Sequence, residues 1–571
     1  MKPDPTFEAA LAECAREPIH VIGAVQPPGV LVAYHPRDLR ILAASANAVE
    51  LFDTGDMAGL LHQRVDALLD RASLAAINAV LARGDSGASQ FACATNLGTM
   101  GALHDLSTHA AGGLVHVELE PSGLGQPLEG GHAMVAGLDA AADGSEFLPS
   151  IARQVQRISG YDRVMVYRFL SDYSGEVVAE ALAGDLASYD GLRYPASDIP
   201  PQARALYLRN RVRVIADVEA SPQPVLQSPE LGEPLDMSFD VLRAVSPVHL
   251  QYLRNMGVRA SMSISLVVDG RLWGLVACHH GSPRPVDARQ RTALDMVGRH
   301  ASMILDAHEL RGHVRGDALR RSHRDALEGR LHRATDADAA AALMPEVLDL
   351  VLGSVDAEGA ALCLDGAWHA HGTTPDSEGL AHALAWAGTQ GHAGAAATAH
   401  GSDWHPNPPK GAACGLFAVP LGQGSGAWLL LFRREQRQTV RWAGRPDRPF
   451  QVDRDGTRIG PRASFEAWEE DVHATSAPWS GRDFELARRL RMVLERYVSG
   501  HHMRTCGAAD QVNQTSDASM LRWDAREQAA RLRRLAELLD GAAPDRARLE
   551  RLRALLTQME DELGALADAL D

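Results

Sequence analysis

Lysine is almost absent from this chain of 571 residues, in which Lys2 and Lys410 are the only two examples. The phosphate-binding loop that ends in Gly-Lys-Ser or Gly-Lys-Thr is therefore missing. Neither lysine stands in a context that favours Schiff-base chemistry. These two classes of site are excluded.

Cysteine is also scarce. The six residues, at positions 14, 93, 278, 363, 414 and 506, include no Cys-x-x-Cys pair. Zinc-ribbon and thioredoxin-like chemistry are thus not indicated, and no metal site is predicted. A large chain with few cysteines suits a reducing compartment, so we expect a cytoplasmic protein.

Long apolar runs and an excess of basic charge are missing as well. No stretch approaches 18 uninterrupted apolar residues, and the N-terminus lacks a basic region followed by an apolar run. Neither a membrane span nor a secretory signal is expected. The formal net charge of −17 disfavours nucleic acid and anionic membrane as partners, because both attract basic surfaces.

The length predicts three or four domains. In a first unit, residues 1–125, the patterns at 30–34, 40–44 and 114–119 predict strands and that at 66–83 a helix. A second unit, 138–315, opens with an amphipathic helix and a strand at 163–169. It continues to a hairpin of residues 261–268 and 272–278, joined by Asp269-Gly270.

Residues 287–333 contain almost no glycine or proline, and their pattern predicts one long helix into a third unit, 316–500. That unit has a predicted strand pair, 415–421 and 427–432. Its glycine-rich link superficially suggests a phosphate loop but is better explained as a hairpin turn, because a strand follows. The polar run 433–475 is too long for an ordinary connection, which points to a function.

The tail, 517–571, carries two heptad seams, 521–539 and 549–570, on either side of a Gly541–Pro544 break. They predict a coiled coil or helical hairpin that pairs with a second copy of the chain. The alternative is a helical hairpin folded back on its own chain.

Four strings stand in a fixed order along the chain. They are Cys14-Ala15-Arg16-Glu17-Pro18-Ile19-His20, Gln26-Pro27-Pro28-Gly29, Pro195-Ala196-Ser197-Asp198-Ile199-Pro200 and Pro461-Arg462-Ala463-Ser464-Phe465. In this order, and at these separations, they resemble the photosensory core of a bacteriophytochrome, a red/far-red photoreceptor. The resemblance covers roughly residues 7–500 and implies an α+β protein with tandem PAS, GAF and PHY domains in the three units, each with an antiparallel sheet flanked by helices. The family usually has histidine where this chain has Pro28.

The resemblance implies a biliverdin cofactor that is linked through a thioether to Cys14. An early cysteine alone would more often be a small apolar filler. Plant and cyanobacterial relatives place the attaching cysteine just before the histidine that matches His249, and here that position is Val248. This pattern is similar to the biliverdin-binding bacterial branch.

The resemblance also assigns a pocket to the GAF domain. Asp198 would reach the pyrrole nitrogens through its backbone carbonyl, although alone it would be read as the cap of a helix near Pro201. His249 and His279 match two pocket histidines, whose titration near neutrality suits proton control. The other matches are arginines and hydroxyl donors for two propionates, aromatics around ring D, and apolar walls: Arg213, Arg243, Tyr207, Ser246, Ser261, Ser263, Tyr167, Tyr194, Met165, Ile199, Tyr252 and Met262.

The third unit contains two strings that resemble the arms of the family's tongue, a hairpin that covers the pocket. They are Trp442-Ala443-Gly444 and the string that contains Arg462 and Ser464. As bare sequence they would pass for an exposed loop. The resemblance implies that Arg462 faces the Asp198 side chain as a latch between domains. Leu192 departs from the polar residue that relatives often carry there.

We expect a non-enzymatic light sensor, a homodimer through the long helices and the tail, that signals to an unknown protein. The alternative is the photosensory part of a light-regulated histidine kinase. After residue 500 only His501 and His502 remain, without phosphoacceptor context, and the remaining 71 residues cannot also house a nucleotide domain of typical size. A GAF domain that binds a cyclic nucleotide would leave Cys14 and the tongue strings unexplained.

Overall fold

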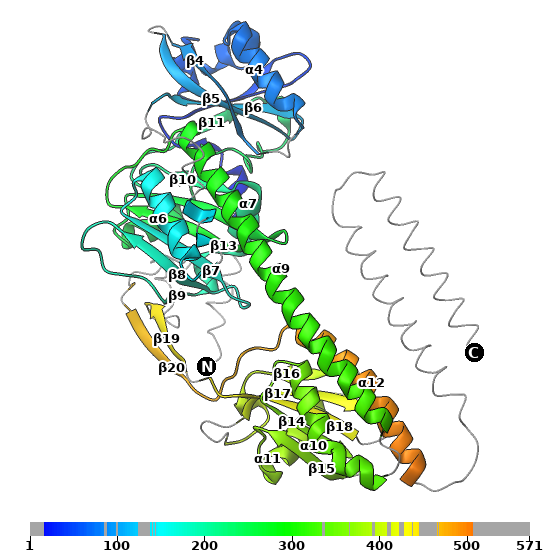
Figure 1. The fold of residues 1–571 in the computed structure, drawn as a ribbon. Coiled ribbons are helices and arrows are strands. Elements are labelled where there is room, and N and C mark those ends of the chain that lie inside the picture. The colour runs from blue at the N-terminus through cyan, green and yellow to red at the C-terminus, as the bar shows by residue number, and fades with distance from the viewer. Residues whose placement is uncertain are drawn as a thin grey trace, which may run out of the picture.

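A computed structural model describes residues 16–505 apart from 85–87, 99–100, 124–136, 140, 143, 334–336, 365, 391–393, 408–412, 422–426, 437, 445–464 and 466. Cys14, Arg462, Ser464 and the tail over 517–571 lie outside the described residues. The described chain forms three α+β domains in a row, and one long helix runs from the second domain into the third (Figure 1).

The first domain is built on a seven-stranded sheet in the order β1-β11-β3-β2-β6-β5-β4. The strands predicted at 30–34, 40–44 and 114–119 are present. The helix predicted from residue 66 begins only at Arg71, because the Asp70 side chain caps it by accepting the Ser73 N–H at 2.7 Å. The elements are β1 (Ala24–Val25), β2 (Val30–Tyr34), β3 (Ile41–Ser45), α2 (Ala48–Phe52), α3 (Met57–Leu60), α4 (Arg71–Ala82), β4 (Gln90–Leu97), β5 (Ala102–Ala111) and β6 (Leu114–Pro121).

Strand β11 (Gln223–Gln227) belongs to the second unit by sequence, yet it lies between β1 and β3 of the first sheet. Val225 pairs with Ser45 on one side, and the other edge of β11 pairs with β1. The Gln26 side-chain amide donates to the backbone oxygens of Val214 and Arg243, at 2.9 and 3.1 Å. The first two domains therefore share backbone pairing.

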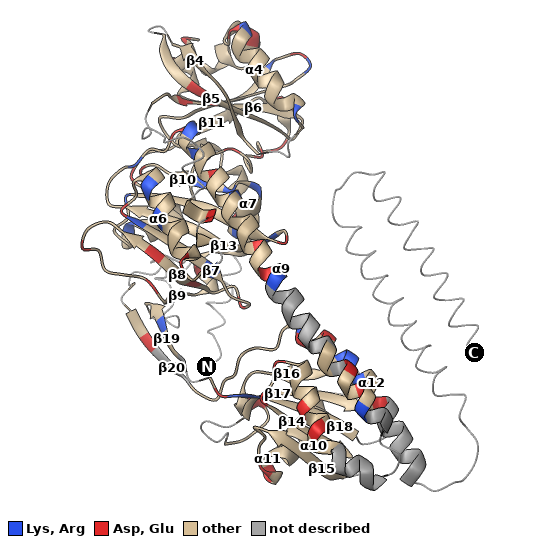
Figure 2. Ribbon diagram, viewed as in Figure 1, with Lys and Arg blue, Asp and Glu red and all other residues tan. Residues whose placement is uncertain are grey.

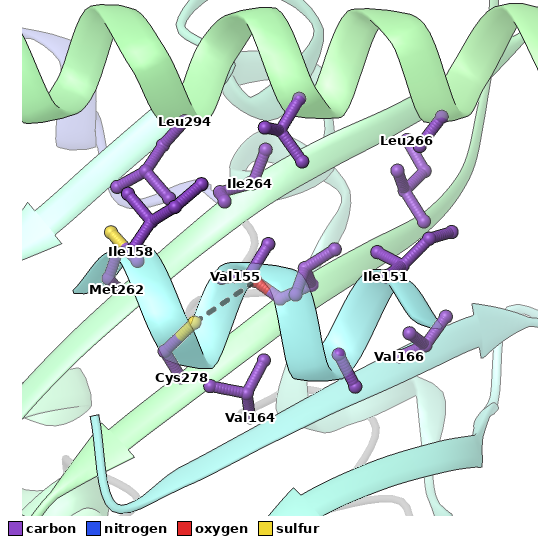
Figure 3. Close-up of a cluster of buried hydrophobic side chains, with 14 of the residues drawn as sticks. Ile151, Val155, Ile158, Val164, Val166, Met262, Ile264, Leu266, Cys278 and Leu294 are labelled. Atoms are coloured by element: carbon purple, nitrogen blue, oxygen red, sulfur yellow. Dashed lines mark hydrogen bonds between the residues drawn. The ribbon is translucent and has the colours of Figure 1, made fainter. Parts of the chain in front are cut away.

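The second domain has strands in the order β10-β12-β13-β7-β8-β9, and its predicted hairpin is present as β12 and β13. Helix α6 places Ile151, Val155 and Ile158 between this sheet and the long helix, where they pack with Leu294 (Figure 3). These side chains bury one face of the sheet. The elements are α6 (Phe147–Ser159), β7 (Arg163–Phe169), β8 (Gly175–Leu182), β9 (Leu192–Tyr194), α7 (Pro201–Arg209), β10 (Val212–Ile215), α8 (Pro247–Asn255), β12 (Ala260–Val268) and β13 (Arg271–His280).

The predicted long helix is present as α9 (Ala288–Arg333). It leads to a third domain with a five-stranded sheet in the order β15-β14-β18-β17-β16. Leu327 of α9 joins the core of this domain with residues of α10 and α12. The elements are α10 (Ala337–Ser354), β14 (Gly359–Leu364), β15 (Ala367–Gly372), α11 (Ser377–Thr389), β16 (Ala396–Thr398), β17 (Ala413–Leu421), β18 (Ala427–Arg434) and α12 (Gly481–Thr505).

Two strands of the polar run leave the third domain and extend the sheet of the second (Figure 1). Strand β19 (Gln438–Ala443) pairs antiparallel with β20 (Ala467–Val472) and parallel with β9. In the described part of the chain, the second and third domains are therefore connected both by α9 and by this pair of strands. The parallel pair is an exception in a fold that the sequence predicts to be antiparallel.

Charged residues of both signs are interspersed along the described ribbon (Figure 2). Among the helices of the part that the structure describes, none combines the length and the hydrophobicity needed to cross a membrane.

Candidate functional site

A cavity of about 240 Å³ lies in the second domain, under helices α7 and α8 and beside strands β7, β10, β12 and β13. It is lined by fourteen residues that the sequence singled out as cofactor contacts. They are Met165, Tyr167, Tyr194, Asp198, Ile199, Tyr207, Arg213, Arg243, Ser246, His249, Tyr252, Ser261, Ser263 and His279. Met262, the further wall residue, also lines it. The structure thus brings together residues that are spread over more than 110 positions of sequence.

Two arginines, the buried Arg243 and the partly buried Arg213, give one wall of the cavity a positive charge. Arg213 on β10 is the register partner of Ser263 on β12, and its guanidinium donates to the carbonyls of Val241 and Ala244, at 3.1 and 2.8 Å. Burial and the neighbouring Arg243 charge lower the pKa of Arg213 to about 9. The described residues place no carboxylate in salt-bridge contact with either guanidinium. This wall suits a ligand with carboxylate groups.

Hydroxyl groups border the same wall. Tyr207, on α7, hydrogen-bonds Ser263. Ser261 and Ser263 alternate along β12 and so face the same side. The Ser246 hydroxyl donates to the Glu17 carboxylate at 2.9 Å, so it joins the N-terminal segment to the pocket.

Two histidines face the cavity from different elements. His249 lies in the first turn of α8, where Pro247 follows Ser246 at the start of the helix, and His279 lies near the end of β13. Burial and the Arg213 charge lower the pKa of His249 to about 4, and burial with the charge of Arg163 lowers the pKa of His279 to about 3. Both imidazoles are therefore neutral at physiological pH and can each donate and accept one hydrogen bond.

Asp198 does not cap helix α7. That helix has Pro200 at its N-cap without a side-chain cap, whereas the Asp198 carboxylate accepts the Tyr252 hydroxyl at 2.8 Å. The Tyr252 ring in turn stacks on His249, with centroids 6.0 Å apart. A hydrogen-bonded and stacked chain thus links the loop of Asp198 to helix α8.

Aromatic residues close the opposite end of the cavity. The rings of Tyr167 and Tyr194 meet edge to face, with centroids 5.9 Å apart, and Phe169 lies 5.3 Å from Tyr167. The predicted tongue covers this end, because Ala443 of β19 is fully buried in the same apolar cluster. Leu192, which departs from the family pattern, is buried in that cluster as well.

The described part of the tongue reaches the Asp198 region. Register places Trp442 of β19 beside Arg193 of β9. Phe465 lies edge to face on Tyr252, with centroids 5.1 Å apart. Arg462 and Ser464 precede Phe465 by three residues and one residue, and their own positions lie outside the described chain.

Sequence reasoning missed several lining residues, including Glu17, Ile19, Gln202, Leu206 and Asn210. Positions 202, 203, 206 and 207 form one face of α7, and Asn210 is the C-cap of that helix, so the helical period counted from Tyr207 could have found most of them. Glu17 and Ile19 also line the cavity, which brings the chain to its wall three residues after Cys14. The residues that surround the cavity fit a large, partly apolar ligand with two carboxylates and polar ring nitrogens.

Family models match all three domains of the chain: "PAS fold" over residues 14–122, "GAF domain" over 143–305 and "Phytochrome region" over 321–504. The chain is 35% identical over 505 residues to a bacteriophytochrome of Pseudomonas aeruginosa, covering 86% of this chain and 67% of that one. It is 35% identical over 512 residues to a bacteriophytochrome of Xanthomonas campestris, covering 84% and 78%. The crystal structure of a bacteriophytochrome from R. palustris superposes with a TM-score of 0.71 at 34% identity, covering 86% of this chain and 99% of that one. This chain therefore belongs to the phytochromes, and its PAS, GAF and PHY domains form the photosensory module of a red/far-red photoreceptor of the kind that binds a bilin chromophore.

Proposed function

We propose that the bilin is biliverdin and that Cys14 holds it through a thioether. None of the described residues that line the cavity is a cysteine, and Val248 occupies the wall position before His249. Glu17, three residues after Cys14, borders the same cavity. The bilin, when bound, supplies the absorption of red light and an isomerisable methine bridge between rings C and D, which amino-acid side chains lack.

The fourteen predicted residues around one cavity carry this proposal. The fixed cations of Arg213 and Arg243 would bind the two propionates, because an arginine guanidinium pairs strongly and directionally with a carboxylate. Neutral His249 and His279 would bond the ring nitrogens and carbonyl groups of the ligand and hold its proton in place. Tyr167 and Tyr194 would pack around the ring that turns.

The attachment is tested by replacing Cys14 with serine, with Cys93→Ser as the matched control. Protein made with biliverdin is denatured, separated on a gel and inspected for zinc-induced bilin fluorescence. We expect the band of Cys14→Ser to be lost and that of Cys93→Ser to be as bright as wild type, since Cys93 lies in the first domain away from the cavity. A bright band from Cys14→Ser would refute the attachment site.

We infer that light changes the tongue, which is the bistable element of the module. The β19–β9 ladder is short and parallel, with only two register pairs, Arg441 with Leu192 and Trp442 with Arg193, so little backbone pairing must be lost to release it. Phe465 on Tyr252 supports an approach of Arg462 and Ser464 to Asp198. In this proposal the Asp198–Arg462 latch exchanges partners, the tongue refolds from sheet to helix, and the helices α9 and α12 transmit the change.

We propose that the signalling form is a cytoplasmic homodimer. Met296, Met303 and Leu310 recur every seven residues on α9 and are 52%, 66% and 63% exposed, which is the spacing of a helix-pairing seam. The predicted heptads of the tail would continue that seam and present a surface to a partner protein.

We further propose that the chain itself is not an enzyme. The second candidate is the photosensory part of a sensor histidine kinase, since the chain spans 67% of the Pseudomonas aeruginosa relative. Autophosphorylation measured with ATP, in darkness and after red light, separates the two functions. Phosphate incorporation into the chain would establish the kinase, and its absence alongside photoconversion would support the sensor.

A further inference from the structure

A second cluster of polar side chains lies outside the chromophore pocket, where the first domain meets the second. It consists of His109 on β5, His116 on β6 and Asp240, which lies between β11 and α8. Their side chains are 1%, 1% and 0% exposed. Such a degree of burial requires that polar groups find partners.

The backbone fixes the two histidines face to face. His109 and His116 are register partners across the β5–β6 hairpin, which turns at Gly112-Gly113. Both glycines have positive φ, 56° and 80°, as a two-residue hairpin turn requires. Directly opposed residues of an antiparallel pair project on the same side, and the ring centroids lie 4.6 Å apart.

Asp240 approaches this pair from the second domain. His116 Nδ1 lies 3.1 Å from both carboxylate oxygens of Asp240. His109 Nε2 lies 3.8 Å from Oδ1, which is beyond hydrogen-bond distance. Among the described residues, neither ring nitrogen of His109 has a hydrogen-bond partner. One ligand atom from each residue lies within 4.8 Å of the others.

These distances are close to those of a metal centre. In a tetrahedral zinc site with bonds of about 2.1 Å, neighbouring ligand atoms lie about 3.4 Å apart. The two observed separations, 3.1 and 3.8 Å, fall on either side of this value. We propose that His109, His116 and Asp240 bind one divalent first-row transition-metal ion, of which zinc is the probe. An ion at this point would give the unpartnered His109 nitrogen a ligand bond, which Asp240 at its present distance does not supply.

The role of this ion would be structural, because the cluster is closed to solvent and lies away from the cavity. It would fasten the hairpin of the PAS domain to the segment that carries Arg243, three residues after Asp240 and on the cavity wall. Hydrogen bonds from both domains already hold that segment: Asn210 donates to the Asp240 carbonyl at 3.4 Å, and the Leu242 N–H donates to Glu118 at 2.7 Å. The metal would thus brace the cationic wall of the pocket.

The test measures zinc in the whole 571-residue chain with its bilin bound. The chain is produced in zinc-supplemented medium, passed over a chelating resin, and its zinc is counted by elemental analysis. We expect about one zinc per chain, and near none in His109→Ala and Asp240→Asn. The matched control is His104→Ala on the same strand, because His104 is also buried but its Nδ1 lies 2.9 Å from the Ala102 carbonyl. It should retain the metal.

A wild-type chain that holds less than about a tenth of a zinc per molecule would overturn the proposal. So would a His109→Ala chain with undiminished zinc, since the metal would then reside elsewhere, for example on the bilin. The wild-type count does not depend on how the variants fold. As a second measurement, the midpoint of thermal unfolding of wild type should be higher with zinc than after its removal, and this difference should vanish in His109→Gln. Equal midpoints of zinc-loaded and zinc-depleted wild type would contradict a structural ion.

Discussion

Gly175 on β8 controls the position of the Tyr167 ring. A methyl group built at residue 175 would overlap ring atoms Cζ and Cε1 and the hydroxyl of Tyr167. The ring cannot simply swing aside, because it is 7% exposed and meets Phe169 at 5.3 Å and Tyr194 at 5.9 Å. In Gly175→Ala the ring must therefore move into the cavity or push β8 outward.

Overpacking of this kind costs about 1–3 kcal/mol of unfolding free energy. We expect Gly175→Ala to lower stability by that amount in urea unfolding and to alter bilin absorption and photoconversion, because the displaced ring borders the ligand. The matched control is Gly388→Ala. It lies in helix α11 with open space around it, and we expect it to stabilise the chain by about 0.5–1 kcal/mol without a spectral change.

A double-mutant cycle separates the local clash from general damage. Tyr167→Val removes the overlapping atoms, so adding Gly175→Ala to Tyr167→Val should cost much less than adding it to wild type. If Gly175→Ala had wild-type stability and spectra, the Tyr167 ring would not lie against Gly175 and the description of this end of the pocket would be wrong.

Three further outcomes are expected. As pH falls from about 6.5 to about 4, the unfolded chain protonates His249 while the folded chain does not, so the unfolding free energy should fall by up to about 1.4 kcal/mol per pH unit from this residue. Urea unfolding at pH 5 and 7.5 should show a smaller loss of stability in His249→Gln than in wild type, and an equal loss would contradict a neutral imidazole in the folded chain. Arg462→Ala should leave the bilin bound but speed the thermal reversion of the photoproduct. Unchanged reversion kinetics after red light would contradict the proposed Asp198–Arg462 latch. Met303→Glu should raise the dimer dissociation constant measured by sedimentation at least tenfold, because it places two like charges in the proposed seam. Glu309→Gln, also on α9, is the control. A Met303→Glu dimer as stable as that of wild type would show that the interface lies elsewhere.

The local parts of the fold could be predicted from the sequence, because they depend on neighbouring residues. The Asp269-Gly270 turn predicted the β12–β13 hairpin, and the lack of glycine and proline predicted α9. The start of α4 was wrong by five residues because the pattern of apolar residues continues past Asp70, whose capping hydrogen bond decides the boundary.

Contacts between distant segments could not be predicted by such reasoning. The parallel pairing of β19 with β9 joins strands about 250 residues apart, and nothing in either local pattern sets that register. The Gly112-Gly113 turn could have paired His109 with His116, but Asp240 reaches them only through the packing of two domains. The attachment at Cys14, the roles of Arg462 and Ser464, and the heptad tail stay predictions because they fall outside the described residues.

The placement of β11 between β1 and β3 has a consequence for the order of folding during synthesis. Strand β3 is complete at Ser45, but its partner begins at Gln223, about 180 residues later. At about 5–20 residues per second the ribosome needs roughly 10–40 seconds to make that stretch. Throughout this interval the edge of β3 can pair with other chains. Slower translation would lengthen this exposure, and a chain released before residue 227 could never close the sheet, so the first two domains mature as one unit.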